Sequence, residues 1–339
     1  MKADADWMQL ALQEARKGLG KTSPNPAVGA VIVKDGQLLS KGWHRRAGRP
    51  HAEIEAIRAL PDPAAARGAT IFITLEPCST HGLTPPCVEA ILAHGFVRVV
   101  VGTTDPNPAH AGRGLEILRR AGVEVVSGVL EDECRRLNEA FNHWIVTRMP
   151  LVIAKCAMSL DGRITRPPGE SQWLTSAPAR KRAHQIRAQV DAILVGAETV
   201  RRDNPQLTIR GLGPRATRRQ PWRVVVSRSG NLPASSNLFT DEWKERTLVF
   251  DDLDTALEEL GQRQATSVLI EGGGEILGAA FDKKLVDRVA FFYAPMLVGG
   301  DKPAVAGLGV ESNESAIQLE QVSYEKLGPD LFCQASVRY

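Results

Sequence analysis

The sequence predicts an α/β protein with two domains. At 339 residues the chain exceeds the size at which a single hydrophobic core stops growing, so two domains are the default expectation. Helix-like and strand-like runs alternate along both halves of the chain, which indicates β-sheets covered by helices. The stretch Arg148-Met149-Pro150 separates the two alternating series. We therefore predict one domain over residues 1–147 and a second over residues 148–339.

Periodicity and turn residues predict the elements of the first half. Apolar residues at helical spacing predict an amphipathic N-terminal helix that contains Met8, Ala11, Leu12, Ala15 and Leu19. Asp35-Gly36 lies between two β-like runs, residues 28–33 and 38–42, and predicts a β-hairpin. Further strands are predicted over residues 70–75, 98–101 and 123–126, and further helices from His51, from Cys87, and over residues 115–121 and 132–146.

The second half alternates in the same way, although no internal repeat relates it to the first. Strands are predicted over residues 151–154, 192–195, 223–226, 247–250, 267–270, 288–292 and 332–338, and helices over residues 179–190 and 275–284. Residues 205–220 are rich in glycine, proline and arginine, which predicts a mobile loop.

Composition excludes several classes of protein. The 42 basic and 39 acidic residues give a net charge of +3, a near balance that argues against a nucleic-acid partner. The N-terminus lacks the apolar core of a signal peptide, and no run approaches the ~20 apolar residues that span a bilayer. The five cysteines form no disulfide framework and fit a reducing compartment. We expect a soluble, cytoplasmic protein without a membrane partner.

The strongest chemical motif consists of His51, Glu53, Cys78 and Cys87. One imidazole and two thiolates fill three corners of a tetrahedral zinc site and leave the fourth corner for water. Zinc-dependent hydrolytic deaminases use this residue set, together with a glutamate that moves protons without binding the metal. We therefore predict a zinc site at His51, Cys78 and Cys87, with Glu53 as the catalytic acid and base of a deamination.

Each of these residues also has a purely structural interpretation. Isolated histidines often cap helices, and buried cysteines usually act as small hydrophobic residues. The conjunction favours zinc, because predicted helix starts at two of the positions would stabilise the thiolate form that binds metal. A structural zinc site closed by His44 or His81 remains an alternative. A nucleic-acid-editing deaminase is also an alternative, although eight residues rather than two separate its cysteine pair here.

A glycine triplet, residues 272–274, lies between a predicted buried strand and a predicted helix. Backbone amides at such a turn can bind a phosphate. The spacing does not match the dinucleotide-binding pattern G-x-G-x-x-G, because Leu277 occupies the position of the third glycine. A tight strand-to-helix turn explains the triplet equally well. Arg187 and Arg210 could each hold a phosphate by two hydrogen bonds, but spacing alone does not distinguish this from solvated surface arginines.

Several motifs occur together and in order along nearly the whole chain. They are residues 22–29 (TSPNPAVG), 42–44 (GWH), 51–53 (HAE), 77–78 (PC), 84–87 (TPPC), 105–108 (DPNP), 111–114 (AGRG), 155–163 (KCAMSLDGR), 171–173 (SQW), 203–205 (DNP) and 271–274 (EGGG). With these motifs the chain resembles the RibD family of riboflavin biosynthesis, in which a pyrimidine deaminase is fused to a reductase. The resemblance implies a cytidine-deaminase-like N-terminal α/β/α layer and a dihydrofolate-reductase-like α/β C-terminal domain that uses NADPH.

The resemblance also implies roles for individual residues. Asn25 and His44 would face the deaminase substrate. NADPH would be held by Ala157, Trp173, Thr199, Asp203, Gly273, Gly274, Glu275 and Ile276. The phosphorylated reductase substrate would contact Lys155, Ser171, Arg187, Leu207, Arg210 and Glu271. Members of the family are homo-oligomers, which implies a dimer or a tetramer.

Two successive reactions are implied in the same way. The first is zinc-dependent deamination of 2,5-diamino-6-ribosylamino-4(3H)-pyrimidinone 5′-phosphate. The second is NADPH-dependent reduction of the ribosyl chain to ribityl, which yields 5-amino-6-ribitylaminouracil 5′-phosphate. Decay of one of the two domains is the remaining alternative.

One departure from the family pattern concerns the loop between the two cysteines. The family commonly has a histidine and a basic residue where this chain has Thr80 and Leu83. No zinc ligand changes, so zinc binding should be retained. A polar contact from this loop to the substrate is lost, and His81 is the candidate substitute.

Overall fold

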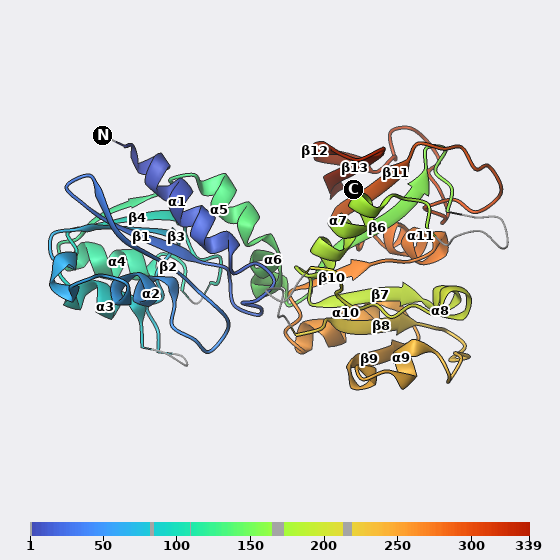
Figure 1. The fold of residues 1–339 in the computed structure, drawn as a ribbon, viewed down its shortest axis with the longest axis horizontal. Helices are drawn as coiled ribbons and strands as arrows, with labels where there is room; N and C mark the ends of the chain where they lie inside the picture. The colour runs from blue at the N-terminus through green and yellow to red at the C-terminus, as the bar shows by residue number, and fades with distance from the viewer. Residues whose placement is uncertain (1, 82–84, 109, 165–172, 213–218) are drawn as a thin grey trace. The chain divides into compact units, whose positions relative to one another are not determined.

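The computed structural model describes residues 2–81, 85–108, 110–164, 173–212 and 219–339. The chain divides into two compact units, Met1–Thr147 and Arg148–Tyr339, and each is described by itself (Figure 1). Each unit has its own mixed sheet with helices on both faces, so the predicted α/β class is confirmed. Within the described residues, none of the helices is both long enough and apolar enough to cross a bilayer.

The sheet of the N-terminal unit has the strand order β2-β1-β3-β4-β5. Its strands are β1 (Gly29–Lys34), β2 (Gln37–Trp43), β3 (Thr70–Leu75), β4 (Arg98–Thr103) and β5 (Glu124–Ser127). β1 is antiparallel to β2 and β3, whereas β3, β4 and β5 are parallel. The predicted hairpin is confirmed: Asp35 and Gly36 have φ angles of 51° and 72°, as a two-residue hairpin turn requires.

Helices cover both faces of this sheet (Figure 1). α1 (Asp4–Arg16) and α5 (Glu131–Leu137) pack on the face that contains Val31 and Phe72. The opposite face, with Ile32 and Ile71, is covered by α2 (Ala52–Arg58), α3 (Cys87–Ala93) and α4 (Arg113–Arg120). Because successive strand residues point to opposite faces, one apolar strand supplies both cores. A short 3₁₀ helix, η1 (Pro63–Ala66), follows α2.

The single helix predicted over residues 132–146 was wrong, because the structure has two helices there, α5 and α6 (Glu139–Thr147). The chain leaves helical geometry at Asn138, where φ is −112° and ψ is 24°. The Asn138 side chain accepts a hydrogen bond from the Ala27 amide at 2.8 Å and donates to the Ala27 carbonyl at 2.9 Å. A buried amide paired with a distant backbone therefore ends the first helix.

The sheet of the C-terminal unit has the order β12-β13-β11-β6-β10-β7-β8-β9. Its strands are β6 (Leu151–Ser159), β7 (Ala192–Gly196), β8 (Trp222–Val226), β9 (Thr247–Phe250), β10 (Ser267–Ile270), β11 (Arg288–Ala294), β12 (Gln318–Leu327) and β13 (Asp330–Arg338). Neighbours from β11 to β9 are parallel, and β13 is antiparallel to both β11 and β12.

Helices of this unit also divide between the two faces of the sheet. α10 (Leu253–Gln262) and α11 (Gly274–Asp282) pack on one face. The opposite face is covered by α7 (Ala177–Arg187), α8 (Ala197–Asp203) and α9 (Asn237–Thr240). A 3₁₀ helix, η2 (Lys244–Arg246), precedes β9. The carboxyl ends of β7 and β10 therefore open between these layers, where α/β proteins commonly place their ligands.

The sequence pattern missed three helices, α8, α9 and α10, the two 3₁₀ helices and the strand β12. β12 escapes because its pairing with β13 shifts register between Glu320 and Ser323, where Gln321 has a φ of 51°. The shift breaks the two-residue alternation that identifies a half-buried strand.

Candidate functional site

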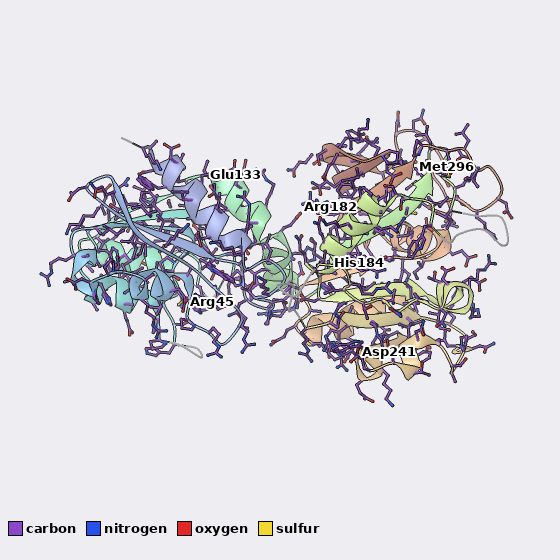
Figure 2. The ribbon with its side chains drawn as sticks, in the orientation of Figure 1. Arg45, Glu133, Arg182, His184, Asp241 and Met296 are labelled. Carbon is purple, nitrogen blue, oxygen red and sulfur yellow. The ribbon has the colours of Figure 1, made fainter. Side chains whose placement is uncertain are left out.

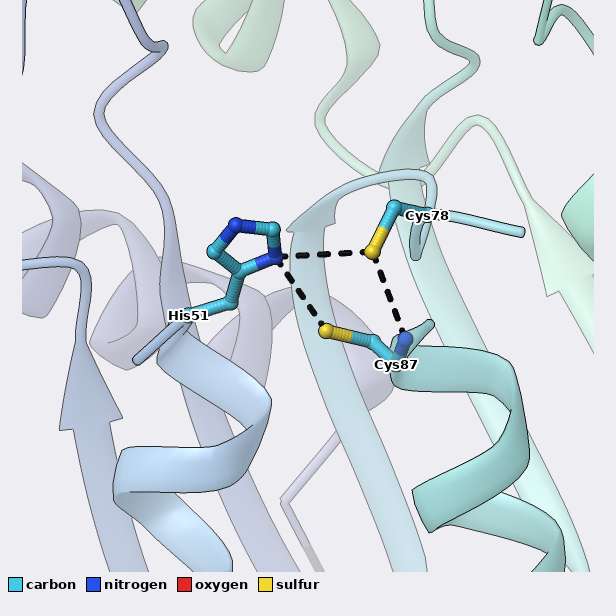
Figure 3. Close-up of side chains that lie close together, drawn as sticks. All are labelled: His51, Cys78 and Cys87. Atoms are coloured by element: carbon cyan, nitrogen blue, oxygen red, sulfur yellow. Dashed lines mark hydrogen bonds between the residues drawn. The ribbon is translucent and has the colours of Figure 1, made fainter. Parts of the chain in front are cut away.

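Three side chains of the N-terminal unit converge at the starts of two helices (Figure 3). His51 is the N-cap of α2, Cys87 is the first residue of α3, and Cys78 follows β3. His51 Nδ1 lies 3.4 Å from Cys78 Sγ and 3.3 Å from Cys87 Sγ. The Cys87 backbone amide donates to Cys78 Sγ at 3.3 Å. The helix and strand boundaries predicted around these residues are confirmed.

The donor set and its spacing fit a zinc ion. All three ligand atoms lie within 4.8 Å of one another. Zn–S bonds of about 2.3 Å and Zn–N bonds of about 2.0 Å at tetrahedral angles imply N···S separations of roughly 3.5 Å, close to those observed. Among the described residues this group supplies three protein ligands, which is typical of catalytic rather than structural zinc sites.

Without metal, the two sulfurs share one negative charge. The hydrogen bond from Cys87, with a smaller effect of His51, lowers the pKa of Cys78 to about 4 despite its burial. The same contact with Cys78, together with burial, raises the pKa of Cys87 above its ordinary value. A coordinated cation would deprotonate both thiols, so metal binding should release a proton from Cys87.

Glu53 lies in the first turn of α2 with only 3% of its surface exposed. It is not part of the group of ligand atoms. Burial raises the pKa of its carboxyl group, and the attraction of His51 only partly offsets this effect. Glu53 is therefore a buried carboxyl beside a metal ligand, suited to hold and release a proton.

Asn25 and His44 form a hydrogen-bonded chain next to the metal ligands. His44 Nδ1 lies 3.1 Å from the Pro50 carbonyl, and His44 Nε2 lies 3.3 Å from Asn25 Nδ2. A carbonyl only accepts, so Nδ1 carries the proton and Nε2 accepts from the Asn25 amide. The His44 ring also meets His51 edge-on at 5.2 Å. Within the described residues, Asn25 Oδ1 is left as a free acceptor beside the site.

Glu76 is a buried residue of this site that the sequence analysis missed. Its carboxylate accepts backbone N–H groups of Asp105 at 3.1 Å, Gly112 at 2.9 Å and Gly114 at 2.9 Å. It thereby ties the segment before Cys78 to residues 105–114. A carboxylate directly before Pro77-Cys78 was visible in the sequence, but nothing there showed that backbone amides would satisfy it.

In the C-terminal unit, Lys155, Arg187 and Glu271 meet at the carboxyl end of β10. Arg187 donates to both Glu271 oxygens, through Nε at 2.5 Å and Nη2 at 2.9 Å. Lys155 Nζ lies 3.4 Å from Glu271 Oε2. Burial alone would raise the pKa of Glu271, but the charges of Arg187 and Lys155 outweigh it and lower this pKa to about 2.

The Arg187 guanidinium is therefore already occupied. Besides the two bonds to Glu271, its Nη1 donates to the Thr208 carbonyl at 3.1 Å. The two-bond phosphate contact considered for Arg187 would have to displace Glu271. Arg210, in contrast, is exposed, and among the described residues its guanidinium donates through Nη1 alone, to Gln206 Oε1 at 2.6 Å. The neighbouring Leu207 side chain is buried in a hydrophobic cluster, so only its backbone can reach a ligand.

The three glycines of the triplet differ in how closely they are packed. A Cβ at Gly272 would lie 1.8 Å from Ile276 Cγ2, and one at Gly274 would lie 2.2 Å from the Pro303 carbonyl oxygen. A Cβ at Gly273 would instead have Thr199 Oγ1 as its nearest atom, at 3.9 Å. Close packing therefore explains Gly272 and Gly274, whereas Gly273, the N-cap of α11, has a neighbour only at ordinary van der Waals distance and could hold a cofactor phosphate.

Most of the other residues implied for NADPH lie on α8, α11 and β6. Glu275 and Ile276 lie in the first turn of α11, and Asp203 ends α8, the helix that contains Thr199. Ala157 lies two residues from Lys155 on the same face of β6. Trp173 is 48% exposed, with the Arg180 guanidinium 5.4 Å from its ring centre.

Two positions singled out in the sequence, Leu83 and Ser171, lie outside the described residues. Thr80, at the other unusual loop position, has its hydroxyl 3.5 Å from His110 Nδ1. His184 also belongs to the second site and was missed, although it precedes Arg187 by one helical turn on α7.

Comparisons with known proteins find a relative for each of the two units. Residues 1–103 match the family described as the cytidine and deoxycytidylate deaminase zinc-binding region, and residues 150–333 match the RibD C-terminal domain. The riboflavin biosynthesis protein RibD of Escherichia coli is 39% identical, over 97% of this chain and 98% of that protein. RibD of Synechocystis is 41% identical, over 97% and 95% of the two chains.

Solved structures extend the agreement to the complete fold. RibD of Acinetobacter baumannii superposes with a TM-score of 0.90 at 37% identity, covering 99% of both chains. A Thermotoga maritima protein described as a diaminohydroxyphosphoribosylaminopyrimidine deaminase/5-amino-6-(5-phosphoribosylamino)uracil reductase superposes with a TM-score of 0.88 at 35% identity, covering 98% of both chains. The resemblance inferred from the motifs is confirmed over the whole length, and the chain belongs to the RibD family of bifunctional riboflavin-biosynthesis enzymes, with a zinc-dependent deaminase and an NADPH-dependent reductase.

Proposed function

We propose that residues 1–147 deaminate 2,5-diamino-6-ribosylamino-4(3H)-pyrimidinone 5′-phosphate and that residues 148–339 reduce the resulting ribosylaminouracil phosphate to the ribityl product. The observation that carries this proposal is the His51, Cys78 and Cys87 group, with a buried carboxyl at Glu53, in a member of this family that matches its relatives over 97% of the chain. The two activities named for the Thermotoga maritima protein indicate the order of the reactions.

For the deamination, zinc bound by His51, Cys78 and Cys87 would supply a polarised water as the nucleophile. Glu53 accepts a proton from this water and delivers it to the departing amino group. The new C–O bond forms at the amine-bearing ring carbon, the C–N bond breaks, and ammonia leaves. The raised pKa of Glu53 suits a residue that must carry the proton between these two events.

Asn25 is proposed to recognise the edge of the pyrimidine. The His44 ring occupies the Asn25 amide nitrogen, so the amide oxygen faces the substrate as an acceptor for a ring N–H or amino group. His44 itself is 2% exposed and has both ring nitrogens engaged. It therefore acts by orienting Asn25 rather than by contacting the substrate.

For the reduction, NADPH supplies the hydride. Gly273 and Thr199 would hold a phosphate of the cofactor, with the other implied residues arranged around them. Hydride transfer to ribose C1′ breaks the bond to the ring oxygen, which takes up a proton and opens the sugar to a ribityl chain. Arg210 is proposed as the main phosphate ligand of the substrate, whereas Arg187 and Lys155 hold Glu271 in the site.

An assay of the purified full-length protein with the diaminopyrimidine nucleotide tests this function. Ammonia release and NADPH absorbance are recorded separately, with and without NADPH. We expect ammonia in both cases and NADPH oxidation only when the deaminated product can form. Ammonia from transfer RNA or single-stranded DNA, but not from the free nucleotide, would contradict the proposed substrate. Activity in only one of the two readouts would contradict bifunctionality.

We also propose that the protein is a cytoplasmic homo-oligomer, either a dimer or a tetramer. All five cysteines are free, and two of them belong to the metal group, which fits a reducing compartment. Along the edge strand β12, Leu319, Val322 and Tyr324 are 41%, 41% and 66% exposed, which would suit a contact with a second copy. Light scattering after gel filtration tests the assembly, and a monomeric mass would refute it.

A further inference from the structure

The segment formed by residues 204–210 follows an unusual backbone path beside the second site. Asn204 and Leu207 adopt left-handed conformations, with φ angles of 41° and 50°. Asparagine tolerates this region, but a leucine does so only when its surroundings compensate the strain. The Leu207 side chain is 3% exposed and packs among apolar residues of β7 and β8. The sequence predicted a mobile loop here, whereas residues 204–210 are held in place.

Three residues anchor this segment: Asn237 on α9, Gln220 two positions before β8, and Arg223 on β8. Asn237 donates two hydrogen bonds of 2.7 Å to Asn204, from its backbone amide to Oδ1 and from Nδ2 to the carbonyl. Gln220 accepts from the Ile209 amide at 2.8 Å and donates to the Ile209 carbonyl at 3.4 Å. The fully buried Arg223, paired with Asp241, donates to the Gln206 carbonyl at 3.2 Å. These contacts hold the backbone at residues 204, 206 and 209. None of them involves the backbone of Arg210.

The Arg210 amide is held from helix α7. It donates to Nδ1 of His184, the residue labelled on α7 in Figure 2, at 3.4 Å. One turn later, Arg187 donates to the Thr208 carbonyl at 3.1 Å. Because Nδ1 accepts a hydrogen bond from an amide, it must be unprotonated. Helix α7 thus holds both an amide and a carbonyl of the segment that carries Arg210.

We propose that His184 is a positioning residue of the reductase site, whose Nδ1 holds the Arg210 amide and thereby directs the Arg210 guanidinium toward the substrate phosphate. This inference rests on the proposed function of Arg210. Neither nitrogen of His184 needs to touch the substrate. His184 supplies one hydrogen-bond acceptor for the backbone of Arg210, the last residue of the segment and the proposed phosphate ligand.

The charges around His184 explain why an imidazole suits this place. Burial is the main cause that lowers the pKa of His184, and the positive charges of Arg187, Arg210 and Lys155 lower it further. Glu271 opposes this effect, and the resulting pKa is about 4. The ring is therefore neutral near pH 7. An aspartate would also accept from the amide, but its charge would compete with the phosphate for Arg210. A lysine would offer no acceptor at all.

The charged side chains around His184 together carry a net charge opposite in sign to the substrate phosphate. With a neutral His184, the three cations Lys155, Arg187 and Arg210 and the single anion Glu271 leave a net charge of +2. A phosphate monoester carries about −1.5 to −2 at pH 7. The cluster is thus complementary in charge to the substrate phosphate with His184 neutral.

Two isosteric substitutions separate the acceptor from the rest of the ring. Asparagine places Oδ1 where His184 has Nδ1, so His184→Asn retains an acceptor for the Arg210 amide. Glutamine places a donor near the position of Nε2, so His184→Gln retains the far end of the ring but not this acceptor. His184→Leu removes both. Lys181→Leu, at an exposed position one turn earlier on α7, is the matched control.

The measurement is steady-state reduction of 5-amino-6-(5-phosphoribosylamino)uracil by the full-length protein, with ammonia release as an internal control. Loss of one such hydrogen bond should raise the KM for this substrate about five- to tenfold in His184→Leu and His184→Gln. We expect kcat, the KM for NADPH and ammonia release to stay within about twofold. His184→Asn and Lys181→Leu should keep the original KM. Arg210→Ala should raise it at least as much as His184→Leu.

The remaining outcomes overturn the inference in distinguishable ways. If Arg210→Ala raises the KM but His184→Leu does not, His184 has no positioning role. If His184→Gln restores the KM and His184→Asn does not, the far side of the ring contacts the substrate instead. If Arg210→Ala leaves the KM unchanged, the phosphate role proposed for Arg210 fails, and the inference fails with it. The Asn and Gln variants keep the test decisive should His184→Leu not fold.

Discussion

The deaminase site and the reductase site of this chain are built in opposite ways. In the first, three metal ligands lie at element ends, and their donor atoms converge closely enough to bind one ion. In the second, most charged groups already bind one another, as Arg187 and Lys155 do with Glu271. The first site is thus defined by which residues are present. The second is defined by which of its charges remain available.

The comparison shows why one site is easier to identify from sequence than the other. His51, Cys78 and Cys87 can be recognised by donor type, because few other functions require this combination. Lys155, Arg187 and Arg210 are common surface residues, and only their partners distinguish a phosphate ligand from an ion-pair support. Changes at the first site should therefore abolish one activity, whereas changes at the second should be graded.

Removing a metal ligand is the most severe test of this contrast. Cys87→Ala leaves two ligands, so zinc should be lost and ammonia release should fall by about 10⁴-fold or more. NADPH oxidation with the deaminated substrate should persist in the same protein. Elemental analysis and the two separate assays check this. Cys134→Ala, a buried cysteine of the same unit outside the metal group, is the control and should keep its zinc.

Glu53→Gln separates metal binding from proton transfer. The amide keeps the size of the side chain but cannot carry the proton, so ammonia release should fall by about 10²- to 10⁴-fold. Zinc content should stay at one equivalent, because Glu53 is not part of the metal group. A variant with full activity would remove Glu53 from the chemistry, and a variant without zinc would make it a ligand.

Glu271→Gln tests the ion pairs that Glu271 forms with Arg187 and Lys155 in the second site. The pKa of Glu271 lies below its ordinary value of 4.5, at about 2, so its ion pairs stabilise the fold above pH 4.5 and lose this effect as the pH falls toward 2. The stabilisation should be roughly 3 kcal/mol. Hydrogen exchange of β10 and α7 peptides in the full-length protein measures it.

In that experiment, the wild-type protein should lose local protection as the pH falls, and Glu271→Gln should show a smaller pH dependence from a lower starting value. Glu258→Gln, at an exposed position on α10, is the control and should behave as the wild type. Equal pH dependence in all three proteins would show that the Glu271 pairs do not stabilise this region.

Gly273→Ala tests the proposed cofactor contact at Gly273 separately from its packing. The added Cβ meets no atom nearer than Thr199 Oγ1 at 3.9 Å, so the variant should fold. It should raise the KM for NADPH by roughly tenfold, because the methyl group occupies space proposed for a phosphate. Gly274→Ala, whose Cβ would lie 2.2 Å from the Pro303 carbonyl oxygen, should instead lower the melting temperature. An unchanged KM in a folded Gly273→Ala protein would move the cofactor elsewhere.

Leu83→Lys should give the smallest effect. A basic residue at this loop position is usual in the family, and a single added charge that solvent screens contributes little by itself. We expect the KM for deamination to fall about two- to threefold, with a dependence on salt and with unchanged zinc content. Leu83→Gln is the uncharged control. A KM that does not change with either charge or salt would mean that this loop position makes no contact with the substrate.

Most individual elements could be predicted, and the failures have physical causes. Strands such as β3 and β9 begin and end where the apolar runs do. The helix break at Asn138 could not be predicted, because it depends on hydrogen bonds to Ala27, which is distant in the sequence. The hydrogen bonds of residues 204–210 could not be predicted for the same reason, since glycine- and proline-rich surroundings indicate a loop but not its distant partners.

The sequence by itself determined the α/β alternation, the zinc ligands and the family, because periodicity and donor type are local properties of the chain. The tertiary structure alone decided that Arg187 serves Glu271 while Arg210 stays available, that Gly273 is open while Gly272 and Gly274 are packed, and that His184 holds the Arg210 amide. The physical reason is that a charge or a hydrogen-bonding group acquires its role from its partner. Partners distant in the chain are known only once the chain is folded.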